Sequence, residues 1–198
     1  MSLPFYREPA QLSGPLHEQD EIEAVTHILP TIRSVDYGVR LVVIRDLYFV
    51  KYGPFVSENE GHALLFLERN LSIPVPRLYA MYRNADKLYI VMQYISGTEL
   101  QDLWPSLSGR EKKSLLGQLR SIFQDIRSLS PPPFYGSVEG GPVPRRYFYA
   151  RDGNPAMTGP FGNEQDFSKA KSLRCSLCTQ RPSTHFHPWE FVSAEYSC

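Results

Sequence analysis

Two cysteines and two histidines near the C-terminus have the residue types and a spacing that could bind a metal ion. Cys175-Ser-Leu-Cys178 is followed by His185 and His187, and thiolates and imidazoles are ligands that zinc prefers. The two histidines are separated by one residue, whereas a zinc finger places about three to five residues between them. Two interpretations therefore stay open, a zinc site and a tail without ordered structure.

Cysteine usage and charge argue against several other classes of protein. All three cysteines lie in the last quarter of the 198 residues, so we expect no disulfide framework, and Cys198 is expected to be a free thiol. Lys plus Arg and Asp plus Glu number 21 each, a balance that does not favour nucleic-acid binding. No apolar run approaches the roughly 18 residues of a membrane span, and the first residues do not resemble a secretory signal. We expect a globular cytoplasmic protein without membrane contact.

Two β-hairpins are predicted in the first half of the chain. Residues 39–45 and 47–52 are rich in β-branched and aromatic side chains, and Arg45-Asp46 between them is a natural turn. Residues 77–82 and 88–95 form a second pair, which turns at residues 84–86. The last of these runs is mostly apolar, so it should be buried on both faces.

Helices are expected before and between these hairpins. Apolar residues at helical spacing predict a short helix over residues 18–29, which Pro30 would end. Ser57-Glu-Asn-Glu60 reads as a capping box, in which the serine oxygen and the glutamate side chain each bind a backbone amide. It predicts a helix over residues 57–70.

A further helix is predicted after a short helical piece at residues 98–104. Ser108-Gly-Arg-Glu111 is a second capping box. The residues that follow at spacings of four and three form the apolar seam of a buried helix: Leu115, Leu119, Ile122, Ile126 and Leu129. From Ser168 onward the sequence has no clear period, so we expect a low-order tail over residues 168–198.

Six short segments, taken in order, resemble one protein family. They are Phe49-Val-Lys-Tyr-Gly53, Asn70-Leu-Ser-Ile-Pro-Val-Pro-Arg77, Tyr89-Ile-Val-Met-Gln-Tyr-Ile-Ser-Gly97, Leu103-Trp-Pro-Ser-Leu107, Phe134-Tyr-Gly-Ser-Val-Glu-Gly-Gly-Pro142 and Gly159-Pro-Phe161. Together they resemble the aminoglycoside-phosphotransferase-like family, in its fungal-type subgroup, over residues 36–167. The resemblance implies a protein-kinase-like fold that moves the γ-phosphate of ATP, with Mg²⁺, to a small-molecule hydroxyl.

The resemblance assigns nucleotide-binding roles to a lysine and a glutamate. Lys51, on the second strand of the first hairpin, would pair with phosphate oxygens; by itself it also reads as a lysine at the solvated end of a strand. Glu60 would pair with Lys51 and hold it in place. Its position in the capping box is the alternative interpretation, and Glu58 is a competing partner for the lysine.

The same resemblance places the connection between two lobes at residues 92–95. Backbone groups of Gln93 and Ile95 would face the adenine edge, and Met92 would form the wall behind it. Gly97 directly afterwards favours a hinge. The loop that should cover the phosphates is poor in glycine, because Val35-Asp-Tyr-Gly38 supplies only one.

The catalytic residues of the family are missing from this sequence. The family carries His-Gly-Asp with a later asparagine and a further aspartate, which accept the substrate proton and hold Mg²⁺. Asp166 is the last aspartate and Asn163 the last asparagine here, so the Mg²⁺ site is expected to be absent. We predict no phosphotransferase turnover from this chain alone.

These observations predict an α+β protein in four parts. Residues 1–30 are a helical or irregular segment, residues 31–96 a kinase-like small lobe, residues 97–167 a hinge, helix and loop that start a large lobe, and residues 168–198 the tail. The abrupt change near residue 168 favours either a truncated gene product or a short protein that keeps the lobe for binding. In both cases we expect at most weak nucleotide binding, or a protein partner on the exposed seam of the helix at residues 110–129.

Overall fold

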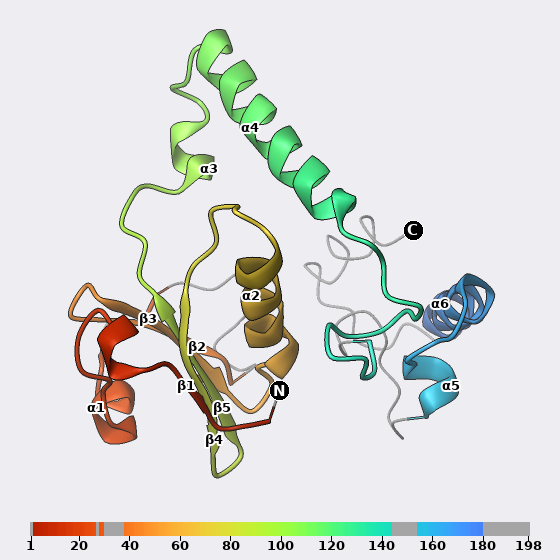
Figure 1. Ribbon diagram of the computed structural model, residues 1–198, viewed down its shortest axis with the longest axis horizontal. Coiled ribbons are helices and arrows are strands. Elements are labelled where there is room, and N and C mark those ends of the chain that lie inside the picture. The colour runs from red at the N-terminus through yellow and green to blue at the C-terminus, as the bar shows by residue number, and fades with distance from the viewer. Residues whose placement is uncertain (1, 27, 30–37, 144–153, 180–198) are drawn as a thin grey trace. The chain divides into compact units, whose positions relative to one another are not determined.

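A five-stranded antiparallel sheet organises the first two thirds of the chain (Figure 1). The structure is a computed structural model that describes residues 2–26, 28–29, 38–143 and 154–179. The strand order is β1-β4-β5-β3-β2. The strands are β1 (Phe5–Tyr6), β2 (Arg40–Ile44), β3 (Tyr48–Gly53), β4 (Leu78–Asn84) and β5 (Lys87–Gln93).

Both predicted hairpins are confirmed. In the first, Arg45 and Asp46 both have positive φ angles, 50° and 54°, the conformation of a two-residue turn whose twist matches that of the flanking strands. In the second, β4 pairs with β5 along its length, and the turn residue Ala85 has a φ of 49°. The centre of β5 is buried on both faces, as its apolar run predicts.

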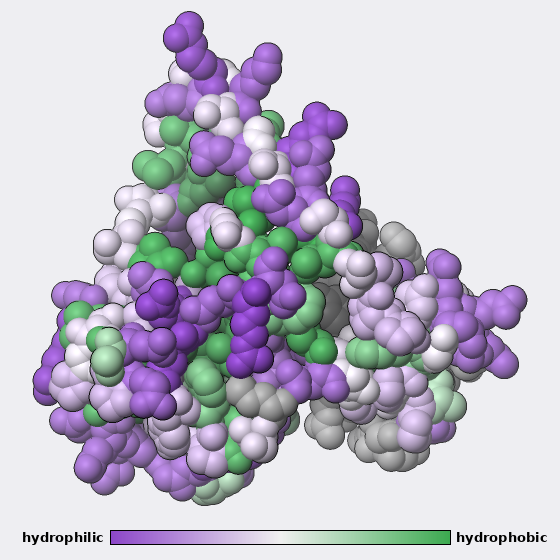
Figure 2. Space-filling view, viewed as in Figure 1, coloured by the Kyte–Doolittle hydropathy of each residue, from purple (hydrophilic) through white to green (hydrophobic). Residues whose placement is uncertain are grey.

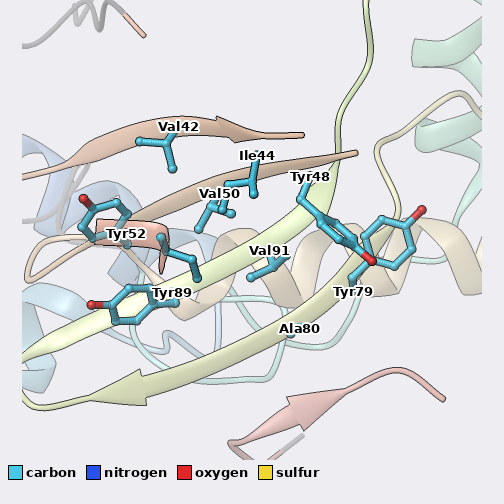
Figure 3. Packing of buried hydrophobic residues seen from close by; sticks show 10 residues of the cluster. Val42, Ile44, Tyr48, Val50, Tyr52, Tyr79, Ala80, Tyr89 and Val91 are labelled. Carbon is cyan, nitrogen blue, oxygen red and sulfur yellow. The ribbon is translucent and has the colours of Figure 1, made fainter. Parts of the chain in front are cut away.

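Alternation along the strands gives the sheet two different faces. Tyr48 and Val50 of β3 belong to one cluster of buried side chains, seen from close by in Figure 3. Ile90 of β5, which is the register partner of Lys51, belongs to a second cluster on the opposite face. Successive residues of a strand point to opposite sides, so Lys51 shares a face with Ile90.

Helix α2 (Glu58–Asn70) packs on the face that carries the second cluster. Leu65 of α2 is buried in this cluster together with Leu78 and Met81 of β4. Gly61 permits the close approach, since a Cβ at this position would lie 2.5 Å from the Met81 sulfur. The predicted helix over residues 57–70 is confirmed, and its backbone is held directly against the sheet.

The N-terminal segment packs against the sheet's other face, which carries the first cluster. It contains β1, a 3₁₀ turn (η1, Pro9–Gln11) and α1 (Gln19–Glu23). Ile22 of α1 is buried in the first cluster, and the Tyr48 hydroxyl donates to the Gly14 carbonyl at 2.5 Å. A segment that the sequence describes as irregular therefore supplies an edge strand and covers one face of the sheet.

The helix expected over residues 18–29 is shorter than predicted. Helix α1 ends at Glu23, and Ile28 instead forms an antiparallel bridge with Val42 of β2. The Leu29 amide donates to the Leu41 carbonyl at 2.8 Å. The unpaired edge of β2 offers hydrogen bonds to a β-branched residue such as Ile28, and this pairing replaces the last turns of the helix.

Two helices follow the sheet, α3 (Leu100–Leu103) and α4 (Gly109–Ser128). The capping box of α4 is confirmed, because Ser108 Oγ accepts from the Glu111 amide and Glu111 accepts from the Ser108 amide. The burial of its apolar seam is not found: the structure describes every residue of α4 and none is buried. Figure 2 shows hydrophobic surface along α3 and α4.

Among the described residues, a second compact unit contains residues 133–136, 141–143 and 154–179, and the first contains the described residues up to 132 together with residues 137–140. The second unit includes α5 (Pro155–Thr158) and α6 (Glu164–Thr179). The tail expected from residue 168 is thus helical as far as Thr179. The amide of Asp166 donates to Asn163 Oδ1 at 2.9 Å at the start of α6, and Ala170 is buried with Phe161.

The chain is an α+β protein with an open antiparallel sheet. The division between its two units falls near residue 132. No helix in the described part of the chain is long and apolar enough to cross a membrane.

Candidate functional site

A lysine and a glutamate from neighbouring elements form an ion pair on the face of the sheet that carries α2. Lys51 Nζ of β3 donates to Glu60 Oε2 of α2 at 2.6 Å. The Lys51 side chain is 25% exposed and the Glu60 side chain 45%. An ion pair this exposed adds about 0–1 kcal/mol to stability, so its main effect is to fix the position of the ammonium group.

The competing interpretation of Glu60 as half of a capping box is wrong in this structure. Ser57 Oγ accepts from the Asn59 amide at 3.3 Å, so the serine does cap the helix. The amide of Glu60 donates to the Ser57 carbonyl instead, and the Glu60 carboxylate binds Lys51.

Glu58, the other candidate partner of Lys51, is engaged elsewhere. Its Oε1 accepts from Arg83 Nε at 2.8 Å, at the far end of β4. Two residues along a helix correspond to a rotation of about 200°, so the two carboxylates cannot serve the same cation. The packing of α2 on the sheet therefore selects Glu60 for Lys51.

A strip of half-buried apolar residues lies beside the ion pair. In the register of the sheet, Val43 of β2 is opposite Phe49 of β3, and Phe49 is opposite Met92 of β5. Leu41 is opposite Lys51 in the adjacent row. All four apolar residues are intermediate in burial. A partly exposed apolar strip next to a cation can bind a molecule with a planar apolar ring and an anionic group.

The predicted connection between lobes at residues 92–95 begins within the sheet, because Met92 and Gln93 belong to β5. Met92 lies in the sheet and packs against the second buried cluster, consistent with a wall residue. The Gln93 amide donates to the Arg77 carbonyl at 2.8 Å, so it is not available to a ligand. The predicted role of the Gln93 backbone at the adenine edge stays a prediction. Ile95 follows the strand and is 62% exposed.

Only the end of the predicted phosphate-covering loop lies within the described residues. Gly38 has a φ of 66°, and residues 35–37 lie outside the described ranges. Gly53, the last residue of β3, has a φ of 144°. A Cβ placed on Gly53 would lie 2.0 Å from the carbonyl oxygen of Gly38. Two glycines therefore meet where the loop returns to the sheet, and the contact brings the two backbones together.

The last aspartate and the last asparagine of the chain act as a helix cap. Asn163 Nδ2 donates to Asp166 Oδ2 at 2.9 Å, and Asn163 Oδ1 accepts from the Asp166 amide. Among the described residues, no three His, Cys or carboxylate side chains are close enough to hold a metal ion. The expected absence of a Mg²⁺ site stays a prediction.

The zinc hypothesis falls largely outside the described residues. Cys175 and Cys178 lie in the last turns of α6. His185, His187 and Cys198 are not among the residues that the structure describes. The choice between a zinc site and a tail without ordered structure stays a prediction.

Sequence reasoning missed a polar network on the other face of the sheet. Glu23 of α1 accepts hydrogen bonds from the Tyr89 hydroxyl and from Lys87 Nζ, the latter at 2.9 Å. These hydrogen bonds lower the pKa of Glu23 to about 2, and the bond from Tyr89 contributes most. Burial raises the pKa of Tyr82, whose ring stacks on Tyr89, to about 12. The sequence signal for this network was the four-residue spacing of Gln19 and Glu23, whose side chains are hydrogen-bonded at 2.9 Å.

Comparison with protein-family models gives no match, and comparisons with curated proteins and with solved structures give none either. The fold and the side-chain geometry therefore carry the functional argument.

Proposed function

We propose that residues 31–96 form the nucleotide-binding small lobe of a protein-kinase-like fold related to the aminoglycoside-phosphotransferase-like family. In this proposal the 198-residue polypeptide binds ATP-type nucleotides weakly and does not transfer phosphate. The observation that carries it is the 2.6 Å pair between Lys51 and Glu60. A strand lysine held by a helix glutamate is the arrangement with which protein kinases position the phosphates of ATP.

The order of the elements supports the proposal independently of this pair. Two antiparallel strands, a helix packed on the sheet and two more antiparallel strands follow one another as β2, β3, α2, β4 and β5. Strand β5 lies beside β3, which places Met92 and the exposed Ile95 near the end of the apolar strip. In the proposal, the adenine ring contacts Val43, Phe49 and Met92, and the phosphates approach Lys51.

In this proposal the chain does not turn over substrate, because residues that phosphoryl transfer requires are missing from the sequence. Metal ions and a positioned carboxylate carry nearly all of this catalysis. Asn163 and Asp166, the last residues of their types, are bonded to each other at the start of α6. No His-Gly-Asp segment occurs in the sequence.

Calorimetric titration of the full chain with ATP, with and without Mg²⁺, tests the proposal. We expect saturable binding that Lys51→Met weakens at least tenfold and Glu60→Gln about three- to tenfold, because both variants remove or release the cation. Glu58→Gln is the matched control and should leave binding unchanged, since Glu58 contacts Arg83. Adenosine, which lacks phosphates, should bind wild type and Lys51→Met equally.

Two results would contradict the proposal. If ATP shows no saturable binding, or if Lys51→Met binds ATP as tightly as wild type, the lysine has no role in phosphate binding. Phosphate transfer to aminoglycosides or other hydroxyl acceptors that Lys51→Ala abolishes would contradict the absence of turnover.

A second proposed role is the docking of a protein partner on α4. Leu116 and Phe123 are each 55% exposed and Leu119 is 41% exposed, an unusual amount of apolar surface for one helix. In this proposal the partner is a second copy of this chain, whose α4 presents the same exposed apolar side chains. Light scattering of the purified chain should show self-association that Phe123→Lys abolishes and Lys113→Glu, a change at an exposed charged residue of the same helix, does not. If wild type and both variants are monomeric, the apolar face of α4 does not mediate association.

A further inference from the structure

A cavity of about 240 Å³ lies between the N-terminal segment and the sheet. Its lining includes Val50 of β3, which points to the opposite side of the sheet from its neighbour Lys51. The cavity is therefore separate from the proposed nucleotide site.

The floor of the cavity is apolar and contains one unusually small residue. Ile44, Val50 and Val91 line it from three strands, and all lie in the cluster drawn in Figure 3. Ala80 of β4 also lines the cavity and is fully buried. A methyl group at this position leaves a space that a larger aliphatic side chain would fill.

Aromatic rings line the cavity as well. Tyr6 of β1 and Tyr82 of β4 stack with their ring centres 5.8 Å apart and their planes at 22°. The ring of Tyr48 also lines the cavity and lies edge-on to His17, with ring centres 6.1 Å apart. Stacked and edge-on tyrosine rings are suited to contact with another flat aromatic molecule.

His17 lines the cavity with a nitrogen that has no hydrogen-bond partner. Its side chain is 5% exposed, and Nδ1 lies 2.9 Å from Glu21 Oε2. The Glu21 carboxylate can only accept, so the proton is assigned to Nδ1 and the buried Nε2 is left as an acceptor in the neutral ring. No described residue donates to this Nε2.

Gln19 supplies a second unused acceptor in the same lining. Its Nε2 donates to Glu23 Oε1 at 2.9 Å, while its buried Oε1 has no partner among the described residues. Leaving a buried acceptor without a donor is unfavourable. Two buried acceptors without a donor, His17 Nε2 and Gln19 Oε1, thus belong to residues that line a cavity with aromatic walls.

We propose that this cavity binds a small aromatic molecule that donates an N–H or O–H hydrogen bond to His17 Nε2. An apolar cavity of about 150 Å³ accommodates benzene, so a volume of about 240 Å³ suits a fused two-ring molecule of the size of indole. The ligand lies against the aromatic side chains of the lining, and its donor points toward His17 and Gln19. Glu21 acts as a positioning residue that holds the histidine ring in the accepting form.

The test compares indole with indene, which has the same shape and no N–H donor. Ligand-observed NMR titrations on the full chain should give saturable binding of indole, tighter than that of indene by roughly three- to tenfold, the contribution of one neutral hydrogen bond. In His17→Phe, which keeps an aromatic ring and removes the acceptor, the two probes should bind equally. Ala80→Leu should abolish binding of both probes, because its side chain fills the cavity.

Thermal unfolding of each variant accompanies the titrations. Ala80→Leu should unfold at a temperature equal to or above that of wild type, since the added side chain enters an existing space. The proposal is overturned if wild type shows no saturable indole binding, if indene binds as tightly as indole, or if a folded Ala80→Leu binds indole as wild type does. A water molecule as the sole occupant would give the first of these results.

Discussion

The carboxylate of Glu23 connects the N-terminal segment to the sheet, and its replacement should lower stability in a way that depends on pH. It accepts from the Tyr89 hydroxyl, from Lys87 Nζ at 2.9 Å and from Gln19 Nε2 at 2.9 Å. The hydrogen bond from Tyr89 contributes most to lowering the pKa of Glu23 from 4.5 to about 2. The folded state therefore favours the ionised form of this side chain.

The size of the effect follows from this pKa and from the exposure of the side chain. The change from 4.5 to about 2 corresponds to about 3 kcal/mol if it were realised fully on folding. The Glu23 side chain is 31% exposed, and water screens its interactions, so we expect about 1 kcal/mol. Because the folded pKa is depressed, the stabilisation is present above about pH 4.5 and is lost as the pH falls toward 2.

Urea unfolding of wild type and Glu23→Gln at pH 7 and pH 3 measures the effect. Wild type should be more stable by about 1 kcal/mol at pH 7, and less than half of this difference should remain at pH 3. Asp20→Asn is the control, since Asp20 lies on the same helix and has no side-chain partner among the described residues; it should cost less than about 0.5 kcal/mol. Equal stabilities at pH 7, or a difference that does not shrink at pH 3, would refute the reasoning.

Three further predictions concern backbone contact, alkaline pH and helix capping. Gly53→Ala should destabilise the fold by about 3 kcal/mol or more in urea unfolding, because the new Cβ would lie 2.0 Å from the Gly38 carbonyl; Gly117→Ala, with open space around it in α4, should instead stabilise by about 0.5–1 kcal/mol. Burial raises the pKa of Tyr82 to about 12, so the folded state favours the neutral phenol. The protein should keep its full stability below about pH 10 and lose stability as the pH rises toward 12. Over that interval Tyr82→Phe should lose less stability than wild type. Asn163→Ala removes the cap of α6 and should lower the helical circular dichroism signal and stability by about 1 kcal/mol; an unchanged signal would show that the cap is dispensable.

The hairpins and the two longest helices of the first unit could be predicted from sequence because their signals are local. Alternating β-branched and aromatic residues define β2 and β3, and Arg45-Asp46 supplies the turn that joins them. Ser108 and Glu111 mark the start of α4 by contacts within one helical turn. Such signals depend on neighbours a few residues apart, so the printed sequence contains them completely.

The pairing at the candidate site depended on the tertiary structure. The sequence identifies Lys51 and offers Glu58 and Glu60 as partners, and local capping rules assign Glu60 to Ser57. The rotation of α2, which packing against Met81 and Leu78 sets, turns Glu60 toward Lys51 and Glu58 toward Arg83. No local pattern specifies how a helix is rotated on a sheet.

The segments that prediction described as irregular became ordered through contacts distant in sequence. Strand β1 forms by pairing with β4 about 75 residues later, and Ile28 pairs with Val42 instead of continuing α1. These polar stretches have little apolar periodicity of their own, and their hydrogen bonds come from edges that exist only once the sheet has formed.

The sequence by itself determined the central strands, the caps of α4 and the identity of the strand lysine. The tertiary structure alone decided which carboxylate meets that lysine, and it alone created the cavity that brings His17 and Ala80 together. The physical reason is that hydrophobic patterning and capping act between near neighbours, whereas ion pairs and cavities depend on how whole elements pack.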